Sequence, residues 1–250
     1  MSYRHKLCCL IAVVALASAT APAEAGRRRS FWLEPDDGLW SEVASWSAGL
    51  PSNAGTVQYK PVFRAVGDDY VVHVDGNYLV RTVRISSPDA TVSIDGNHTL
   101  SVTKRTVITN GQLLFDGGAL QGGRLWARDP GGIDFTDAGG TLAGVVVCRA
   151  LRLTTQDGWV ALTGNSRLKG DVDLHGDGTM LYMGQNYKFH HQSILLNGAD
   201  SVFYLGANSR VQVGGNLVLT STWTLRLKDG GGTADLTDRI VFLTYTGVLT

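Results

Sequence analysis

The sequence is poor in the residues that cross-link or interrupt a chain. It has 3 cysteines and 6 prolines in 250 residues, and Cys8 and Cys9 lie in the N-terminal segment discussed below. Cys148 is then alone, so no internal disulfide can form, and no Cys/His spacing of a zinc site is present. Burial and backbone hydrogen bonding must therefore hold the fold. Cys148 follows three valines, which favours a small buried core residue over a reactive thiol.

An excess of charge of one sign is also absent. The chain has 22 Lys and Arg against 22 Asp and Glu, a net charge of +0. This balance gives no electrostatic argument for a nucleic acid or an acidic membrane surface, and we predict no nucleic-acid partner. No later apolar run is long enough for a membrane span in the mature chain. The motifs of serine hydrolases, phosphate-binding loops and zinc proteases are missing as well, so no strong catalytic signature stands out.

The N-terminal segment, up to Ala25, has the pattern of a secretory signal peptide. Arg4, His5 and Lys6 form a basic start, the segment 7–19 is almost entirely apolar, and Ala23-Glu24-Ala25 offers a cleavage site. The apolar run is shorter than the roughly 20 residues that a spanning helix needs. The alternative is an uncleaved N-terminal anchor. We predict that the protein is secreted, extracellular or held at the cell surface.

Glycine is abundant, at 31 of 250 residues, against a usual ~7%. Short alternating apolar runs replace helical periodicity, and motifs return at nearly constant spacing. The pattern apolar-x-x-Asn occurs at Leu162-Thr163-Gly164-Asn165, Met183-Gly184-Gln185-Asn186 and Leu205-Gly206-Ala207-Asn208, at almost equal intervals. Earlier, Asp75-Gly76-Asn77 returns as Asp95-Gly96-Asn97 after a similar interval, and Val72/Val92 and Val74/Ile94 precede it in register. A period of roughly 20–22 residues is typical of a solenoid of stacked coils.

The competing all-β architecture is a sandwich or an antiparallel barrel. The repeats favour a single-stranded parallel β-helix instead, right-handed by default, with seven to eight coils between Tyr70 and Lys228. The returning asparagines also suggest amide ladders between coils.

The ends of the chain differ from its middle. The segment 31–66 holds three of the six tryptophans, which predicts an aromatic cap over the first coil. We therefore divide the chain into a signal peptide at 1–25, a tail and cap at 26–66, and a solenoid at 67–250. No cap is evident at the other end, so we expect the solenoid to continue beyond residue 250.

Two segments carry a family resemblance. The first runs from Gly38-Leu39-Trp40 to Ala44-Ser45-Trp46-Ser47-Ala48-Gly49-Leu50-Pro51, and the second spans residues 238–249. They resemble the opening and closing strands of bacterial secreted β-helix proteins of the autotransporter-passenger and C-terminal-sorting-signal types. The resemblance implies a β-helix and export, and it implies no ligand.

One polar cluster has the composition of a catalytic site. Strand alternation would place Asp171, Asp173 and His175 on one face, opposite Val172 and Leu174. Two carboxylates and an imidazole could supply an acid and a base for cutting a polysaccharide, or oxygen ligands for Ca²⁺. The simpler interpretation, which we favour, is the outward side of an exposed strand.

Three aromatic residues recur near the coil period. Trp159, Tyr182 and Tyr204 follow one another at almost equal intervals, so their rings could form a stacking surface for glycans. The alternative, which we favour, is a stack inside the core.

These observations predict a structural or adhesive module of a bacterial surface or extracellular matrix, with no cofactor except, in the calcium interpretation, Ca²⁺. The alternatives are a polysaccharide lyase or hydrolase on a β-helix scaffold and a glycan-binding module. Extracellular polysaccharide or cell-surface components are the expected partners.

Overall fold

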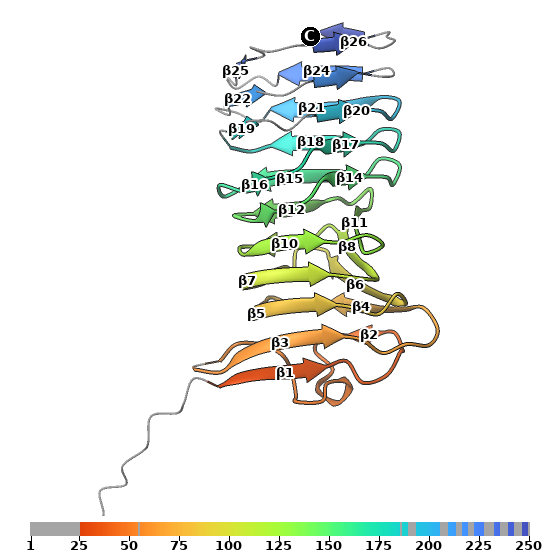
Figure 1. The fold of residues 1–250 in the computed structure, drawn as a ribbon, viewed down its shortest axis with the longest axis vertical. Helices are drawn as coiled ribbons and strands as arrows, with labels where there is room; N and C mark the ends of the chain where they lie inside the picture. The colour runs from red at the N-terminus through yellow and green to blue at the C-terminus, as the bar shows by residue number, and fades with distance from the viewer. Residues whose placement is uncertain are drawn as a thin grey trace, which may run out of the picture.

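The protein is a stack of β-strand rungs. The computed structural model describes residues 26–54, 56–185, 187–189, 194–205, 210–213, 217–219, 223–227, 233–235, 240–242 and 247–249. The predicted signal peptide thus lies outside the described residues. The strands follow one another along a single long axis, from β1 (Arg27–Phe31) at one end to β27 (Gly247–Leu249) at the other (Figure 1). Every pairing between two named strands is parallel.

This architecture confirms the predicted all-β solenoid, although the number of coils differs slightly from the expected seven to eight. The one helical element in the described residues is the short 3-10 turn η1 (Val43–Ser45). No helix in the described part of the chain has the length and apolarity needed to cross a membrane.

Four sheets run along the stack. The main sheet contains β1, β3 (Gln58–Phe63), β5 (Tyr78–Ile85), β7 (Thr99–Ile108), β9 (Ala119–Gln121), β12 (Gly140–Ala143), β15 (Trp159–Thr163), β18 (Met180–Met183), β21 (Ser201–Leu205), β24 (Trp223–Leu227) and β27, and from β7 it branches through β10 (Arg124–Ala127), β13 (Val146–Val147) and β16 (Arg167–Leu168). The second sheet contains β2 (Gly38–Leu39), β4 (Tyr70–Val74), β6 (Ala90–Asp95), β8 (Gln112–Asp116) and β11 (Gly132–Phe135). The third contains β14 (Leu151–Leu153), β17 (Val172–Leu174), β20 (Ile194–Leu196), β23 (Leu217–Leu219) and β26 (Ile240–Phe242), and the fourth contains β19 (Tyr187–Phe189), β22 (Arg210–Val213) and β25 (Thr233–Asp235).

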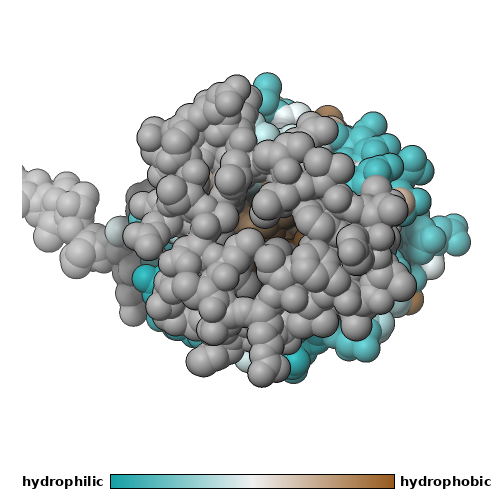
Figure 2. All heavy atoms as spheres, turned by 90° about the horizontal axis from the view of Figure 1, so that it is seen from above, coloured by the Kyte–Doolittle hydropathy of each residue, from teal (hydrophilic) through white to brown (hydrophobic). Residues whose placement is uncertain are grey.

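Strand alternation separates the core from the surface. In β4, Tyr70, Val72 and Val74 are buried, whereas the residues between them are half-exposed. Figure 2, which looks along the stack, shows hydrophobic atoms at the centre and hydrophilic residues around the outside. Inside the stack, the rings of Phe115 and Phe135 lie with centroids 4.6 Å apart. Burial of such apolar side chains is the main source of stability in a chain without a disulfide.

Two of the sequence repeats are confirmed as structural repeats. Val72 pairs in register with Val92, and Val74 pairs with Ile94. In the later coils, Leu162 pairs with Met183, which pairs with Leu205. The equivalent residues of each repeat therefore occupy the same place in successive coils.

Asn165, the asparagine of the first apolar-x-x-Asn repeat, lies in a turn between strands. Gly164 and Asn165 both have a positive φ, 61° and 65°, which asparagine tolerates better than most residues. The contact between rungs comes from Gln185 instead: it donates from Nε2 to the Ser166 carbonyl over 2.8 Å and accepts from the Ser166 backbone N–H over 3.1 Å. Asn186 and Asn208, the other members of the predicted ladder, lie outside the described residues.

The predicted aromatic cap is present at the first coil. Trp32, Trp40 and Trp46 are all buried, at 3% exposure or less, and Phe63 packs against them. The ring centroids of Trp32 and Trp40 each lie 5.1 Å from that of Trp46. The Trp46 indole N–H donates to the Trp40 carbonyl over 2.9 Å, which satisfies the one polar group of that ring. The cap thus closes the apolar interior at this end.

Cys148 departs from the sequence expectation. Val145 and Val147 are the buried residues of their segment, so alternation leaves Cys148 half-buried on the outer side. The run of valines suggested burial, but only alternate residues of a strand enter the core.

Candidate functional site

The predicted Asp171, Asp173 and His175 set lies on the outer side of the third sheet. Val172 and Leu174 are fully buried, which confirms the predicted alternation. Asp171 and His175 are exposed and Asp173 is half-buried. His175 Nδ1 lies 3.9 Å from Asp173 Oδ2, a distance at which the two groups interact only weakly.

Asp173 is engaged by both neighbouring rungs. Arg152, its register partner on β14, places Nε 3.1 Å from Asp173 Oδ2. From the following rung, Asn197 donates through Nδ2 to Asp173 Oδ1 over 2.7 Å. Both carboxylate oxygens therefore link successive rungs. In the described part of the chain, no group of three or more His, Cys, Asp or Glu side chains is placed to hold a metal ion.

The three predicted aromatic residues do not form one ladder. Tyr182 and Tyr204 are in register, and their rings stack with centroids 5.1 Å apart. The register partner of Tyr182 on the preceding rung is Ala161, whereas Trp159 pairs with Met180. The Trp159 indole donates to the Asp137 carbonyl over 3.1 Å and its ring covers Gly139.

The core interpretation of these aromatics is wrong. Leu181 and Met183 of β18 and Ser201 and Phe203 of β21 are buried. Tyr182 and Tyr204 therefore take the alternating outward positions and are half-buried there. The outer face thus carries a stacked pair of rings.

A serine, an aspartate and a histidine also meet on the second sheet. His73 and Ser93 are register partners on β4 and β6. Asp95 accepts a short hydrogen bond from the Ser93 hydroxyl, and its Oδ2 lies 2.5 Å from His73 Nδ1. In a catalytic triad the imidazole contacts the nucleophile and the carboxylate supports the imidazole. Here the carboxylate contacts both the hydroxyl and the imidazole, so the three side chains do not have the order of a catalytic triad.

The most distinctive surface lies on the outer side of the main sheet, near the N-terminal end. We call it the basic face, and it consists of Arg29, Lys60, Arg84, Arg105, Arg124 and Arg128. Arg29 and Lys60 are direct register partners, as are Arg105 and Arg124. Lys60 is half-buried and the arginines are exposed. Like charges placed opposite one another on paired strands are destabilising, so this arrangement works against the fold.

The charges of the basic face are not compensated by nearby carboxylates. Among the described residues, no ion pair involves any of its side chains. Burial lowers the pKa of Lys60, and the positive charges of three neighbours lower it further: Arg29, Arg84 and Arg105.

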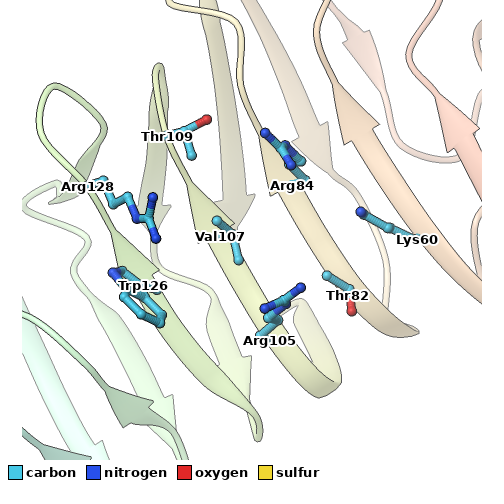
Figure 3. Close-up of a pocket in the computed structure, with 8 residues that line it drawn as sticks. All are labelled: Lys60, Thr82, Arg84, Arg105, Val107, Thr109, Trp126 and Arg128. Carbon is cyan, nitrogen blue, oxygen red and sulfur yellow. The ribbon is translucent and has the colours of Figure 1, made fainter.

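A shallow hollow of about 210 Å³ lies within the basic face (Figure 3). Its lining comes from four successive strands of the main sheet: Lys60, Thr82, Arg84, Arg105, Val107, Thr109, Trp126 and Arg128. The Arg128 guanidinium lies over the Trp126 ring, 5.1 Å from its centroid. The indole N–H of Trp126 is buried and has no hydrogen-bond partner in the described part of the chain. The hollow therefore combines positive charge, one aromatic ring and an unsatisfied donor.

The sequence carries a weak signal for this face. Lys60, Arg84 and Arg105 recur at intervals close to the coil period. The net charge hides the pattern, because the carboxylates are placed elsewhere. Asp95 and Asp116, for example, are register partners on the second sheet.

Comparison of the chain with protein families, with curated proteins and with solved structures finds no match.

Proposed function

We propose that the protein is an exported structural or adhesive module of a bacterial surface or extracellular matrix, which holds an extracellular polymer against the outer side of the solenoid. The predicted signal peptide supports export, and the resemblance of the two terminal segments to secreted β-helix proteins supports a bacterial source. The solenoid suits this role because each rung adds the same outward positions at about 4.8 Å intervals, which gives an extended surface rather than a single deep pocket.

The observation that carries the choice against catalysis is the state of Asp173. Its two oxygens bind Arg152 and Asn197 of the adjoining rungs, so they tie the stack together. A general acid or base must instead reach the substrate, with a pKa suited to proton transfer. The hollow of the basic face lies on another sheet and contains no carboxylate or imidazole in its lining.

A depolymerisation screen tests this proposal. The purified protein is incubated with pectin, alginate, glycosaminoglycans and plant glucans, with and without Ca²⁺, and new reducing ends and double-bond absorbance are measured. We expect no cleavage, together with retention of the protein on at least one immobilised polymer. Cleavage that disappears in the Asp171→Ala/Asp173→Ala variant would make the protein an enzyme.

The stacked tyrosines favour a second candidate function, glycan binding through aromatic rings. Tyr182 and Tyr204 present adjoining rings on an outward face, and sugar rings stack on such surfaces. In this case the protein would be retained on an immobilised neutral glucan, and the Tyr182→Ala variant would not be retained.

A further inference from the structure

The basic face differs from the places on the surface where charged groups of neighbouring rungs are matched. Examples of such matching are the Arg152–Asp173 and His73–Asp95 pairs. On the basic face, Arg29 opposes Lys60 and Arg105 opposes Arg124, with no carboxylate between them. Local arrangements that oppose stability without a structural compensation are typical of functional sites.

The cations are arranged as a strip that follows the stacking axis. One row of register partners runs through Thr82, Arg105 and Arg124. A second row, two positions further along the same strands, runs through Arg84, Val107 and Trp126. Arg84, Arg105 and Arg124 therefore lie on three successive rungs, which are spaced about 4.8 Å apart, with Arg84 in the second row and the other two in the first. A compact anion would engage only one or two of them, whereas a linear polyanion lying along the axis would engage them all.

The hollow supplies contacts of a second kind. Trp126 lies at one end of it with the Arg128 guanidinium over its ring, and together they form a flat wall against which a sugar can pack. Thr82 and Thr109 add hydroxyl groups among the cations. Positive charge, hydroxyls and one ring together match an acidic sugar better than an isolated phosphate.

We propose that the basic face is a binding site for an acidic polysaccharide, whose chain runs along the stacking axis and presents carboxylate or sulfate groups to the arginines of successive rungs. The rung spacing is close to the length of one sugar residue in an extended chain, so the charges of the two polymers can stay in step. The proposal rests on the proposed adhesive function and names the class of polymer that is held.

Two observations favour a polysaccharide over a nucleic acid. The strip is narrow and lies on a protein whose net charge is zero, so a thick polyanion such as a duplex would also meet the acidic parts of the surface. The hollow contains one aromatic ring, whereas proteins that bind single strands stack successive bases on several rings. A nucleic acid is therefore treated as an outcome that would contradict the proposal.

Equilibrium binding to defined polymers tests the proposal. The purified protein is titrated with polygalacturonate, heparin, neutral dextran and a single-stranded DNA oligonucleotide at several salt concentrations. We expect binding to polygalacturonate, heparin or both, weakening with salt because exposed charges are screened, and no binding to dextran. The first two polymers separate carboxylate from sulfate recognition.

The variant Arg84→Gln/Arg105→Gln tests the residues. It keeps both exposed side chains polar and of similar length, and circular dichroism checks that the fold is intact. We expect the affinity to fall by about tenfold or more, as for the loss of two charge-assisted contacts, and the salt dependence to become shallower. The control Arg152→Gln removes an exposed cation on the third sheet, away from the basic face, and is expected to leave the affinity unchanged. Because Arg152 pairs with Asp173, circular dichroism checks the fold of this variant as well.

The outcomes separate this proposal from the adhesive function. Three outcomes would overturn the basic-face proposal. The first is an equal loss of affinity in the basic-face variant and in the control. The others are tighter binding to DNA than to either acidic polysaccharide, and no binding to polygalacturonate or heparin. If the protein is then still retained on a neutral polymer, the adhesive function stands without it. Cleavage of a bound acidic polymer would instead overturn the adhesive function while leaving the binding site in place.

Discussion

Tyr182 and Tyr204 stack on the outer face of the main sheet, as register partners on β18 and β21 with ring centroids 5.1 Å apart. Ladders of like residues are a natural product of a solenoid, because each coil returns the chain to the same lateral position. The tyrosine pair stabilises the stack by ring contact, whereas the arginines of the basic face repel one another. The stacking of coils thus produces both a ring contact that stabilises the fold and a row of cations that can bind a ligand.

The tyrosine pair should be energetically coupled. We expect a double-mutant cycle with Tyr182→Ala and Tyr204→Ala to give a coupling free energy of about 0.5–1.5 kcal/mol, the usual range for aromatic pairs. Urea unfolding measures it. The matched control pairs Tyr182→Ala with Tyr59→Ala, far away on β3, and should be additive to within about 0.5 kcal/mol. Equal coupling in both cycles would show that the ring contact contributes nothing of its own.

Gly139 should be far less tolerant of substitution than Gly96. Both have a positive φ, 68° and 53°, but a Cβ at position 139 would lie 2.0 Å from the Trp159 ring, whereas one at position 96 meets nothing within 4 Å. We expect Gly96→Ala to lower the free energy of unfolding by about 1–2 kcal/mol through backbone strain alone. Gly139→Ala adds an overpacking cost of about 1–3 kcal/mol.

Thermal and urea unfolding of the two glycine variants provides the measurement. The double variant Gly139→Ala/Trp159→Ala removes the ring that the new methyl group meets, so the extra cost should shrink relative to Trp159→Ala alone. Equal destabilisation by Gly96→Ala and Gly139→Ala would contradict the role assigned to the Trp159 contact.

The protein should lose stability at alkaline pH through Tyr70. Burial, with a further contribution from the Asp89 carboxylate, raises the pKa of Tyr70 to about 12. A raised pKa means that the folded state favours the neutral phenol, so this stabilisation is complete below the unfolded-state pKa of about 10 and is lost as the pH rises towards 12. The full loss, complete only above pH 12, is about 3 kcal/mol, from roughly 1.4 kcal/mol for each of the two pKa units.

Urea unfolding of Tyr70→Phe at pH 8 and pH 11 checks this prediction. The Tyr70 hydroxyl is buried without a hydrogen-bond partner among the described residues, so the variant should change stability at pH 8 by less than about 1 kcal/mol. At pH 11 it should be more stable than the parent. Tyr78, whose pKa is likewise raised to about 12, keeps part of the alkaline loss in place. If the variant loses as much stability between pH 8 and pH 11 as the parent does, Tyr70 is not the source of the alkaline loss.

The basic face shows why a predicted fold did not yield the site. Thr82 pairs with Arg105 and Arg84 with Val107, so Arg84 and Arg105 are diagonal neighbours rather than register partners. Their spacing in the sequence resembles the coil period, but a register shift between Val80 and Thr82 moves the pairing of β5 with β7 by one residue. The net charge of the chain cannot reveal the strip either, because it does not depend on where the positive and negative side chains lie.

The sequence by itself determined the parts that depend on local periodicity. The regular return of short motifs predicted the solenoid, and pairs such as Val72 with Val92 followed directly from aligned repeats. Alternation placed Val172 and Leu174 in the core and left the polar residues between them outside. The early tryptophans predicted a cap because an open end of apolar rungs must be covered.

Only the tertiary structure decided which side chains meet across rungs. Tyr182 pairs with Ala161, which lies two positions after Trp159, so the alanine takes the place expected for the indole. A shift by two positions keeps a side chain on the same face while moving it to another row, and the sequence pattern cannot detect this change. The stacked tyrosines and the diagonal arginines of the basic face were therefore set by the register of each rung on the next. This register depends on the turns between strands and, for Arg84 and Arg105, on the register shift between Val80 and Thr82.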